Sequence, residues 1–200
     1  ILHLIQAVSK LPLALRPHLD IAGDGPMKQE AEQMAQDFGV SASFNFLGAV
    51  SRQWVQQCCS GYAAMVLPFC KVEGGIMDTG PLVIKEAMAL KIPLLTTDIM
   101  ATGEFVDADC AFISNSSDPE DLARTLLKLL VSLKFVSLDS RLLAALQPQL
   151  GPKVSELTEV LNNPKMDELI ENKIEIGYHK VMNEFSAQRQ GLTLSKIFQQ

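Results

Sequence analysis

The chain has 200 residues, of which 48% are hydrophobic, and a formal net charge of −6 at pH 7. This composition is sufficient for one sizeable core, and the acidic balance argues against a nucleic-acid partner, because phosphate backbones bind basic patches. No apolar run approaches the roughly 20 residues of a transmembrane helix, and the first residues lack the basic flank and cleavage site of a signal peptide.

Helical and strand-like segments alternate through the first two thirds of the chain. Ser51 suits the N-cap of one helix and Gly39 the C′ position of another, while the apolar run 63–67 is typical of a strand buried on both faces. Strands separated by helices predict an α/β domain with a doubly wound parallel sheet, in which ligands bind beyond the carboxyl ends of the strands. The predicted strands are 18–22, 43–47, 63–67, 92–96 and 111–113, and the predicted helices are 2–11, 27–38, 51–59, 81–90 and 118–133.

The pattern changes after Phe135, where helical segments follow one another without a strand. Pro148 is expected to end the first of them. We therefore divide the chain into an α/β domain of residues 1–133 and a helical extension of residues 134–200. The chain begins with Ile1 on a helix-like segment, so it looks like a piece of a longer protein. The expected helices of the extension are 140–147, 154–161 and 165–185.

Two carboxylates, Asp78 and Glu86, flank a helix start at Gly80 and Pro81. Gly80 allows a tight turn, and Pro81 suits the first helical position because its missing N–H would be unpaired there. The free amides of such a helix start attract phosphate. One carboxylate before this anion site and one beyond it would grip the two sugars of a nucleotide sugar. The alternative is an ordinary α/β helix with a solvated Asp before it and a surface Glu on it. Because the segment follows the strand 63–67, it falls on the binding rim of the predicted sheet.

The four cysteines indicate no metal site. Cys58, Cys59, Cys70 and Cys110 lack paired CxxC spacing and nearby histidines, and they are typical of small apolar residues in a reducing compartment. The three histidines are scattered, and we assign none a catalytic role.

Seven segments together resemble the nucleotide-sugar-binding, Rossmann-like half of a GT-B glycosyltransferase, in the large retaining group that is family-4-like. They follow one another in order and with natural spacing over about the first 130 residues. The tail 177–186 also resembles the closing helix of that family, whereas the stretch 135–175 is longer than usual and has no assigned role. The seven segments are 21–26, 46–50, 66–69, 78–89, 93–97, 103–106 and 118–123.

The resemblance implies roles for seven residues of the donor site. For the two glycines a plain strand-to-helix turn is the alternative reading. The implied contacts are Asp78 with the donor sugar, Glu86 with the ribose, the backbone amides of Leu82 and Val83 with the diphosphate, the main chain of Val50 with the base, and Gly23 and Gly25 as an open turn at the rim.

Two positions depart from the family pattern. Thr79 replaces the glycine that commonly follows the first acid, so the loop is expected to be stiffer or differently placed. Lys85 stands at a position that is usually apolar, and we expect it to be exposed or to pair with a carboxylate.

The expected function is the donor-binding half of a retaining glycosyltransferase. The resemblance implies that the Arg and Lys which neutralise the donor phosphates, and the domain that binds a saccharide or lipid-linked acceptor, lie upstream, so this chain alone is expected to be inactive. No cofactor or metal is expected beyond the nucleotide-diphosphate sugar. Two alternatives remain: a non-catalytic nucleotide-sugar-binding or regulatory module, and a related GT-B epimerase. We expect a cytoplasmic location, with peripheral membrane association left open.

Overall fold

The structure is a computed structural model that describes residues 1–70, 82–99, 102–155, 157–158 and 163–185. All five predicted strands are present close to their predicted bounds: β1 Leu19–Ala22, β2 Phe44–Gly48, β3 Met65–Leu67, β4 Leu94–Thr97 and β5 Phe112–Ser114. The helices are α1 Leu2–Ser9, α2 Lys28–Asp37, α3 Arg52–Cys58, α4 Leu82–Ala89, α5 Pro119–Ser132, α6 Ser140–Leu150 and α8 Met166–Lys180. Short 3-10 turns occur at Leu13–Leu15, Ser41–Ser43, Cys59–Gly61 and Pro152–Ser155, and a π-helical turn, Val181–Phe185, follows α8.

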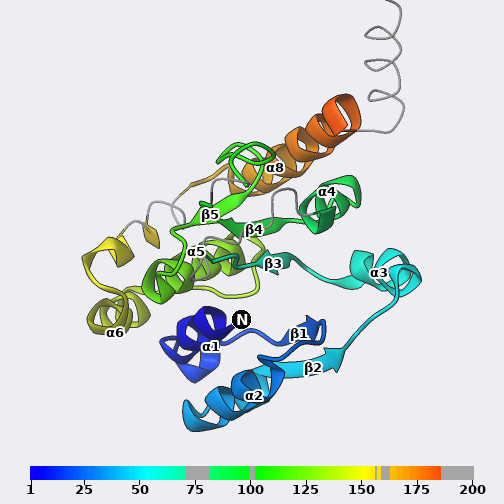
Figure 1. The fold of residues 1–200 in the computed structure, drawn as a ribbon. Coiled ribbons are helices and arrows are strands. Elements are labelled where there is room, and N and C mark those ends of the chain that lie inside the picture. Colours follow the sequence, from blue (N-terminus) through cyan, green and yellow to red (C-terminus); the bar gives the residue numbers. More distant parts are fainter. Residues whose placement is uncertain (71–81, 100–101, 156, 159–162, 186–200) are drawn as a thin grey trace, which may run out of the picture.

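The five parallel strands form two sheets. β1 pairs with β2, so that Leu19 lies opposite Phe44, and β4 pairs with both β3 and β5. Within the described ranges no strand pairing joins β1 to β3, and each of these strands therefore has one open edge. The two sheets lie one above the other in Figure 1. The predicted α/β class with parallel strands is confirmed, but the expected continuous sheet is divided.

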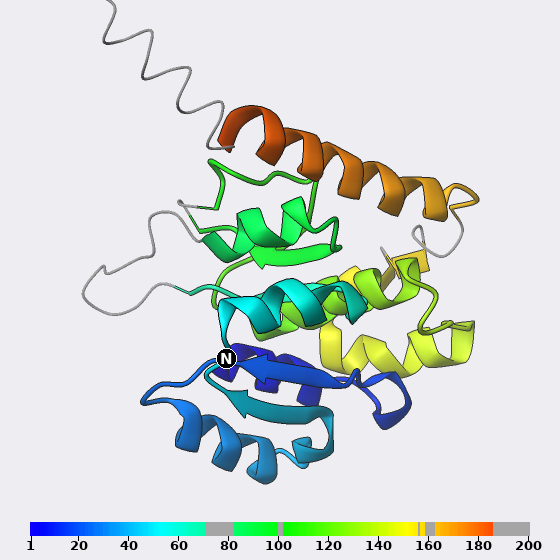
Figure 2. The same cartoon turned by 90° about the vertical axis from the view of Figure 1, so that its right-hand side faces the viewer.

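The larger hydrophobic core lies between α1 and α5. Leu4, Ile5 and Val8 share one face of α1, as the helical repeat requires, and all three are buried. They pack with the buried face of α5, which includes Leu126 and Leu127. In Figure 2, α1 lies on the far side of the strands and α3 on the near side, as in a sheet covered on both faces.

A second core joins α4 to the end of the described chain. Ile84, Ala87 and Met88 of α4 are buried there with Phe105 and residues near β4 and β5. The C-terminal helix α8 and its π-helical turn pack against α4. An ion pair of 2.6 Å between Lys91 Nζ and Glu175 Oε1 joins α8 to the segment after α4.

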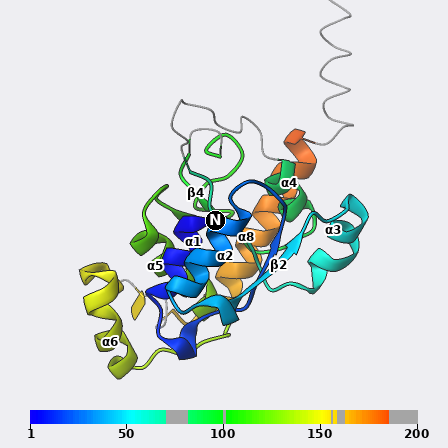
Figure 3. The ribbon, with the colours of Figure 1, turned by 60° about the horizontal axis from the view of Figure 1, so that its bottom comes forward.

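Helices α3 and α6 lie at opposite sides of the molecule (Figure 3). Ser51 caps α3 as predicted, because its side chain accepts a hydrogen bond from the Trp54 N–H. Every residue of α3 is nevertheless exposed or half-buried. This crossover helix is therefore not packed onto a complete sheet surface.

Three local expectations are corrected. The strand β3 is half-buried instead of buried on both faces, and β4 is the strand buried along its whole length. Pro148 does not end the helix: the proline lies in the last turn of α6, which continues two residues further, to Leu150. The expected helix 154–161 begins as the 3-10 turn Pro152–Ser155, and much of it lies outside the described residues.

None of the helices in the described ranges has the length and apolarity needed to cross a membrane.

Candidate functional site

A cavity of about 430 Å³ lies between the open edges of β1 and β3. Its walls include Ile21 of β1 and Val66 of β3, and α3 and α4 contribute Val55 and Val83. Beyond the carboxyl end of β3 it extends to Phe69. The cavity therefore reaches the edge of the sheet at which α/β proteins bind their ligands.

Three of the predicted donor-site residues line this one cavity: Val50, Val83 and Glu86. Val50 follows β2, whereas Val83 and Glu86 lie three residues apart and therefore share a face of α4. The opposite face of α4 is anchored in the second core by Ile84 and Met88. Packing of that apolar face thus directs the Glu86 carboxylate towards the cavity, where it is half-buried.

The other predicted residues are placed differently. Leu82 begins α4, and its side chain is 70% exposed. The predicted contact with a diphosphate uses only the backbone amide of this residue. Gly23 joins the ends of β1 and β2, because its N–H donates to the Gly48 carbonyl at 2.7 Å. Gly25 donates its N–H to Asp24 Oδ1 at 3.0 Å within the same turn. Asp78, with Thr79, lies outside the described residues.

A polar network that the sequence analysis did not single out also borders the cavity. The Tyr62 hydroxyl donates to Asp20 Oδ2, and Asn45 Nδ2 donates to Asp20 Oδ1 at 3.0 Å. The hydrogen bond to the carboxylate raises the pKa of Tyr62 to about 12. Asp20 and Asn45 are the second residues of β1 and β2 and lie opposite each other in the strand pair. A sequence analysis that had paired the two strands in this register would have predicted their contact.

The Cys59 thiol lines the cavity on the side of α3. Burial raises the pKa of this thiol, and its electrostatic interactions with Cys58 and Glu86 raise it further. A neutral thiol is a poor nucleophile and a poor metal ligand. Cys59 is therefore an apolar wall of the cavity, as the sequence analysis expected for the cysteines.

Lys85 differs from both sequence-based expectations. It is half-buried, and its ammonium group lies 4.2 Å from the centroid of the Phe105 ring and 4.8 Å from that of Phe185. In the part of the chain that the structure describes, it forms no ion pair with a carboxylate. The side chain thus faces the second core while the neighbouring Glu86 faces the cavity.

Metal-ligating side chains do not gather in the described ranges, where no three of His, Cys, Asp or Glu lie close enough together to hold an ion.

Residues 1–132 match the sequence model of the family described as "Glycosyl transferases group 1". No curated protein matches the chain in sequence.

Several solved structures share the fold. A glycosyltransferase from Rickettsia africae ESF-5 is 15% identical, with a TM-score of 0.67 over 98% of this chain and 43% of its own. WaaG, a glycosyltransferase involved in lipopolysaccharide biosynthesis, is 21% identical, with a TM-score of 0.53 over 87% of this chain and 42% of its own. Anabaena HepE in complex with UDP-glucose is 17% identical, with a TM-score of 0.55 over 80% of this chain and 43% of its own. The chain therefore spans less than half the length of each of these proteins.

Proposed function

The chain belongs to the group 1 glycosyltransferases, and from this premise we propose that it binds a nucleotide-sugar donor and forms the donor-binding half of a retaining glycosyltransferase. The observation that carries the proposal is the convergence of Val50, Val83 and Glu86 on one cavity, which runs between β1 and β3 and extends beyond the carboxyl end of β3. That the related HepE was solved with UDP-glucose supports the same class of ligand.

Each of these residues has a distinct part in the proposal. The Glu86 carboxylate accepts hydrogen bonds from the two ribose hydroxyls, since each of its oxygens has lone pairs to offer. The first amides of α4, those of Leu82 and Val83, approach the diphosphate, where free N–H groups and the helix dipole stabilise negative charge. The main chain of Val50 contacts the base. Asp78 is proposed to hold the donor sugar.

Transfer with retention requires a sugar with oxocarbenium character to form while the nucleoside diphosphate leaves. Rate enhancement in such a site comes from charge stabilisation and positioning, and the residues of this half contribute by binding the leaving group. The proposal requires no metal and no general base from this chain.

We place the acceptor-binding domain, and the cations that neutralise the diphosphate, in a part of the protein outside these 200 residues. The chain covers only 43% of the Rickettsia enzyme, which supports a longer functional protein. The open edges of β1 and β3 support it too, because a further parallel strand between them would unite the two sheets into one. Such a strand would fill the part of the cavity between the two edges, and the donor would occupy the part that extends beyond the carboxyl end of β3. Closure of two domains around the donor would then assemble the reactive site.

The test is nucleotide binding to the full-length protein, measured by calorimetry with UDP, GDP, ADP and their sugar conjugates. Glu86→Gln is expected to weaken binding of the preferred nucleotide about tenfold, since a hydrogen bond to a charged group contributes about 1.5–3 kcal/mol. Glu171→Gln, at an exposed position on α8, is the control and is expected to leave the affinity unchanged. Tight binding that is indifferent to Glu86→Gln would refute the role of this carboxylate.

The products distinguish the competing functions. A retaining transferase gives a glycoside whose anomeric configuration, read by NMR, equals that of the donor. Donor binding without transfer to any acceptor would instead indicate the binding module. Conversion of the donor sugar in the absence of an acceptor would indicate the epimerase.

A further inference from the structure

We propose that Lys85 is a positioning residue, whose ammonium group between Phe105 and Phe185 acts together with the packing of Ile84 and Met88 to fix the rotation of α4 and thereby aim Glu86 into the cavity. Its expected effect on donor binding rests on the function proposed above, whereas its effect on the order of α4 does not.

The cation lies between two rings that also contact each other. Lys85 Nζ is 4.2 Å from the centroid of Phe105 and 4.8 Å from that of Phe185. The two ring centroids are 5.1 Å apart, with an edge-to-face angle of 66°. A cation over an aromatic face is attracted by the negative charge of the π system, and the attraction is stronger where water is excluded. Phe105 is 7% exposed, so this contact is largely shielded.

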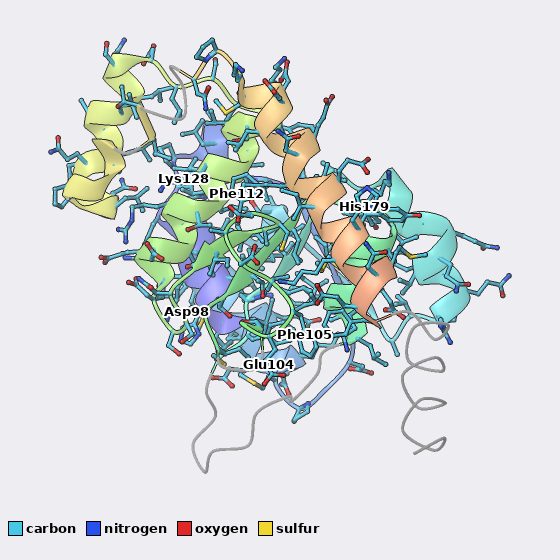
Figure 4. All side chains as sticks on the ribbon, turned by 90° about the horizontal axis from the view of Figure 1, so that it is seen from above. Asp98, Glu104, Phe105, Phe112, Lys128 and His179 are labelled. Carbon is cyan, nitrogen blue, oxygen red and sulfur yellow. The ribbon has the colours of Figure 1, made fainter. Side chains whose placement is uncertain are left out.

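The first ring belongs to the hydrogen-bonded turn that follows β4. The Phe105 N–H donates to the Thr102 carbonyl at 2.9 Å. The Thr102 hydroxyl, itself buried, lies 2.6 Å from the carbonyl oxygen of Thr97, the last residue of β4. Figure 4 shows Phe105 beside the C-terminal end of α8. Lys85 therefore connects α4 to the sheet.

The second ring belongs to the π-helical turn that follows α8. Phe185 is the last residue of this turn, and Val181 at its start is buried in the second core. The helix α8 is also attached by Lys91–Glu175 and by Lys180–Asp107, which do not involve Lys85. Loss of the Lys85 charge is thus expected to weaken the contact of α4 with Phe185 without detaching α8, which also packs against α4 in the second core.

The link to the candidate site is one of helix geometry. Consecutive residues of an α-helix point about 100° apart, so a fixed direction for Lys85 fixes the direction of Glu86. An apolar residue at this position could pack with the rings but would have no charge to hold it between their faces. The lysine that departs from the family pattern therefore has a specific orienting contact.

The experiment compares Lys85→Met, which keeps the stem and removes the charge, with Lys85→Arg, which keeps the cation. Phe185→Leu removes one ring, and Lys134→Met is a control that removes only an exposed ion pair with Asp167. In the full-length enzyme, Lys85→Met and Phe185→Leu are expected to raise the KM for the donor about tenfold with little change in kcat. Lys85→Arg is expected to stay within about twofold of the wild type, because guanidinium also binds ring faces.

Amide hydrogen exchange gives a second measurement that does not require activity. In Lys85→Met the amides of α4 are expected to exchange faster, while those of α5 and α8 are unchanged. Unchanged exchange in α4, or a donor KM that is not restored by Lys85→Arg, would overturn the positioning role. If the wild-type protein binds no nucleotide but α4 exchange still responds to Lys85→Met, the proposed function fails and the orienting contact stands.

Discussion

Asp107 and Lys180 show how one residue pair makes the stability of the protein depend on pH. Lys180 Nζ lies 3.0 Å from Asp107 Oδ2 and joins α8 to the turn before β5. The hydrogen bond from Lys180 lowers the pKa of Asp107, although partial burial of the carboxyl opposes this shift. The pKa of Lys180 is raised, because its contacts with Asp107 outweigh the effect of burial. Both shifts favour the charged pair.

The acid side of this dependence gives a testable expectation. A carboxyl with a lowered folded-state pKa contributes stability above its unfolded pKa, about 3.9, and loses it as the pH falls through the folded value. Asp107→Asn is expected to lower the free energy of unfolding at pH 7 by about 0.2–1 kcal/mol, the range known for exposed pairs. This loss is expected to shrink as the pH falls below about 3.9 and to vanish once the pH is below the lowered folded-state pKa of Asp107. Urea unfolding between pH 2.5 and 7 measures this difference. Glu104→Gln, at an exposed carboxylate labelled in Figure 4, is the control, and an equal loss in both variants would contradict the assignment.

Residue positions that depend on local geometry could be predicted from the sequence. Val83 and Glu86 share a face of α4 because the helical repeat places them there, and both line the cavity. The rings around Lys85 could not be predicted, since Phe105 and Phe185 are remote in sequence and only tertiary packing brings them together. The network of Tyr62 with Asp20 was missed for the same reason.

Among the elements, α5 is the helix whose start is best defined by its own sequence. The Asp118 carboxylate accepts hydrogen bonds from the N–H groups of Glu120 and Asp121, each at 3.0 Å. Pro119 occupies the first turn, and two acids follow it near the positive end of the helix dipole. These contacts are local, which is why the helix was predicted almost to the residue. The end of α6 was not, because a proline in a last turn is compatible with either outcome.

Removal of the α5 cap is expected to destabilise the larger core, since this helix packs against α1. Asp118→Ala should lower the free energy of unfolding by about 1 kcal/mol, whereas Asp118→Asn, which retains a side-chain acceptor, should lower it by much less. Chemical denaturation of both variants at neutral pH measures the difference. Equal losses would show that the charge, and not the cap, stabilises the helix.

At the scale of the whole molecule, the two sheets and the cavity between them dominate the architecture. The apolar residues Trp54, Val55 and Cys59 border that cavity from α3 and the turn after it. The division could not be predicted, because the pattern within each strand is the same whether or not a neighbouring strand lies beside it. Pairing is a non-local property, and β3 is only half-buried as a result.

This architecture predicts an uneven pattern of protection. In the 200-residue chain the amides of α3 are expected to exchange faster than those of α5, whose residues are mostly buried. In a longer protein with a strand between β1 and β3, α3 should gain at least tenfold protection while α5 changes little. Amide hydrogen exchange with mass spectrometry compares the two proteins. Equal protection of α3 in both would show that nothing further packs beneath it.

The open edges of β1 and β3 also bear on how the chain behaves in a crowded solution. Unpaired N–H and C=O groups along a strand are a template for another strand, and natural proteins cover or interrupt such edges to avoid aggregation. Here two templates face each other across an apolar cavity. An isolated copy of the chain therefore carries a built-in tendency to associate with itself through intermolecular β-pairing, and shielding of these edges is a condition for keeping it monomeric.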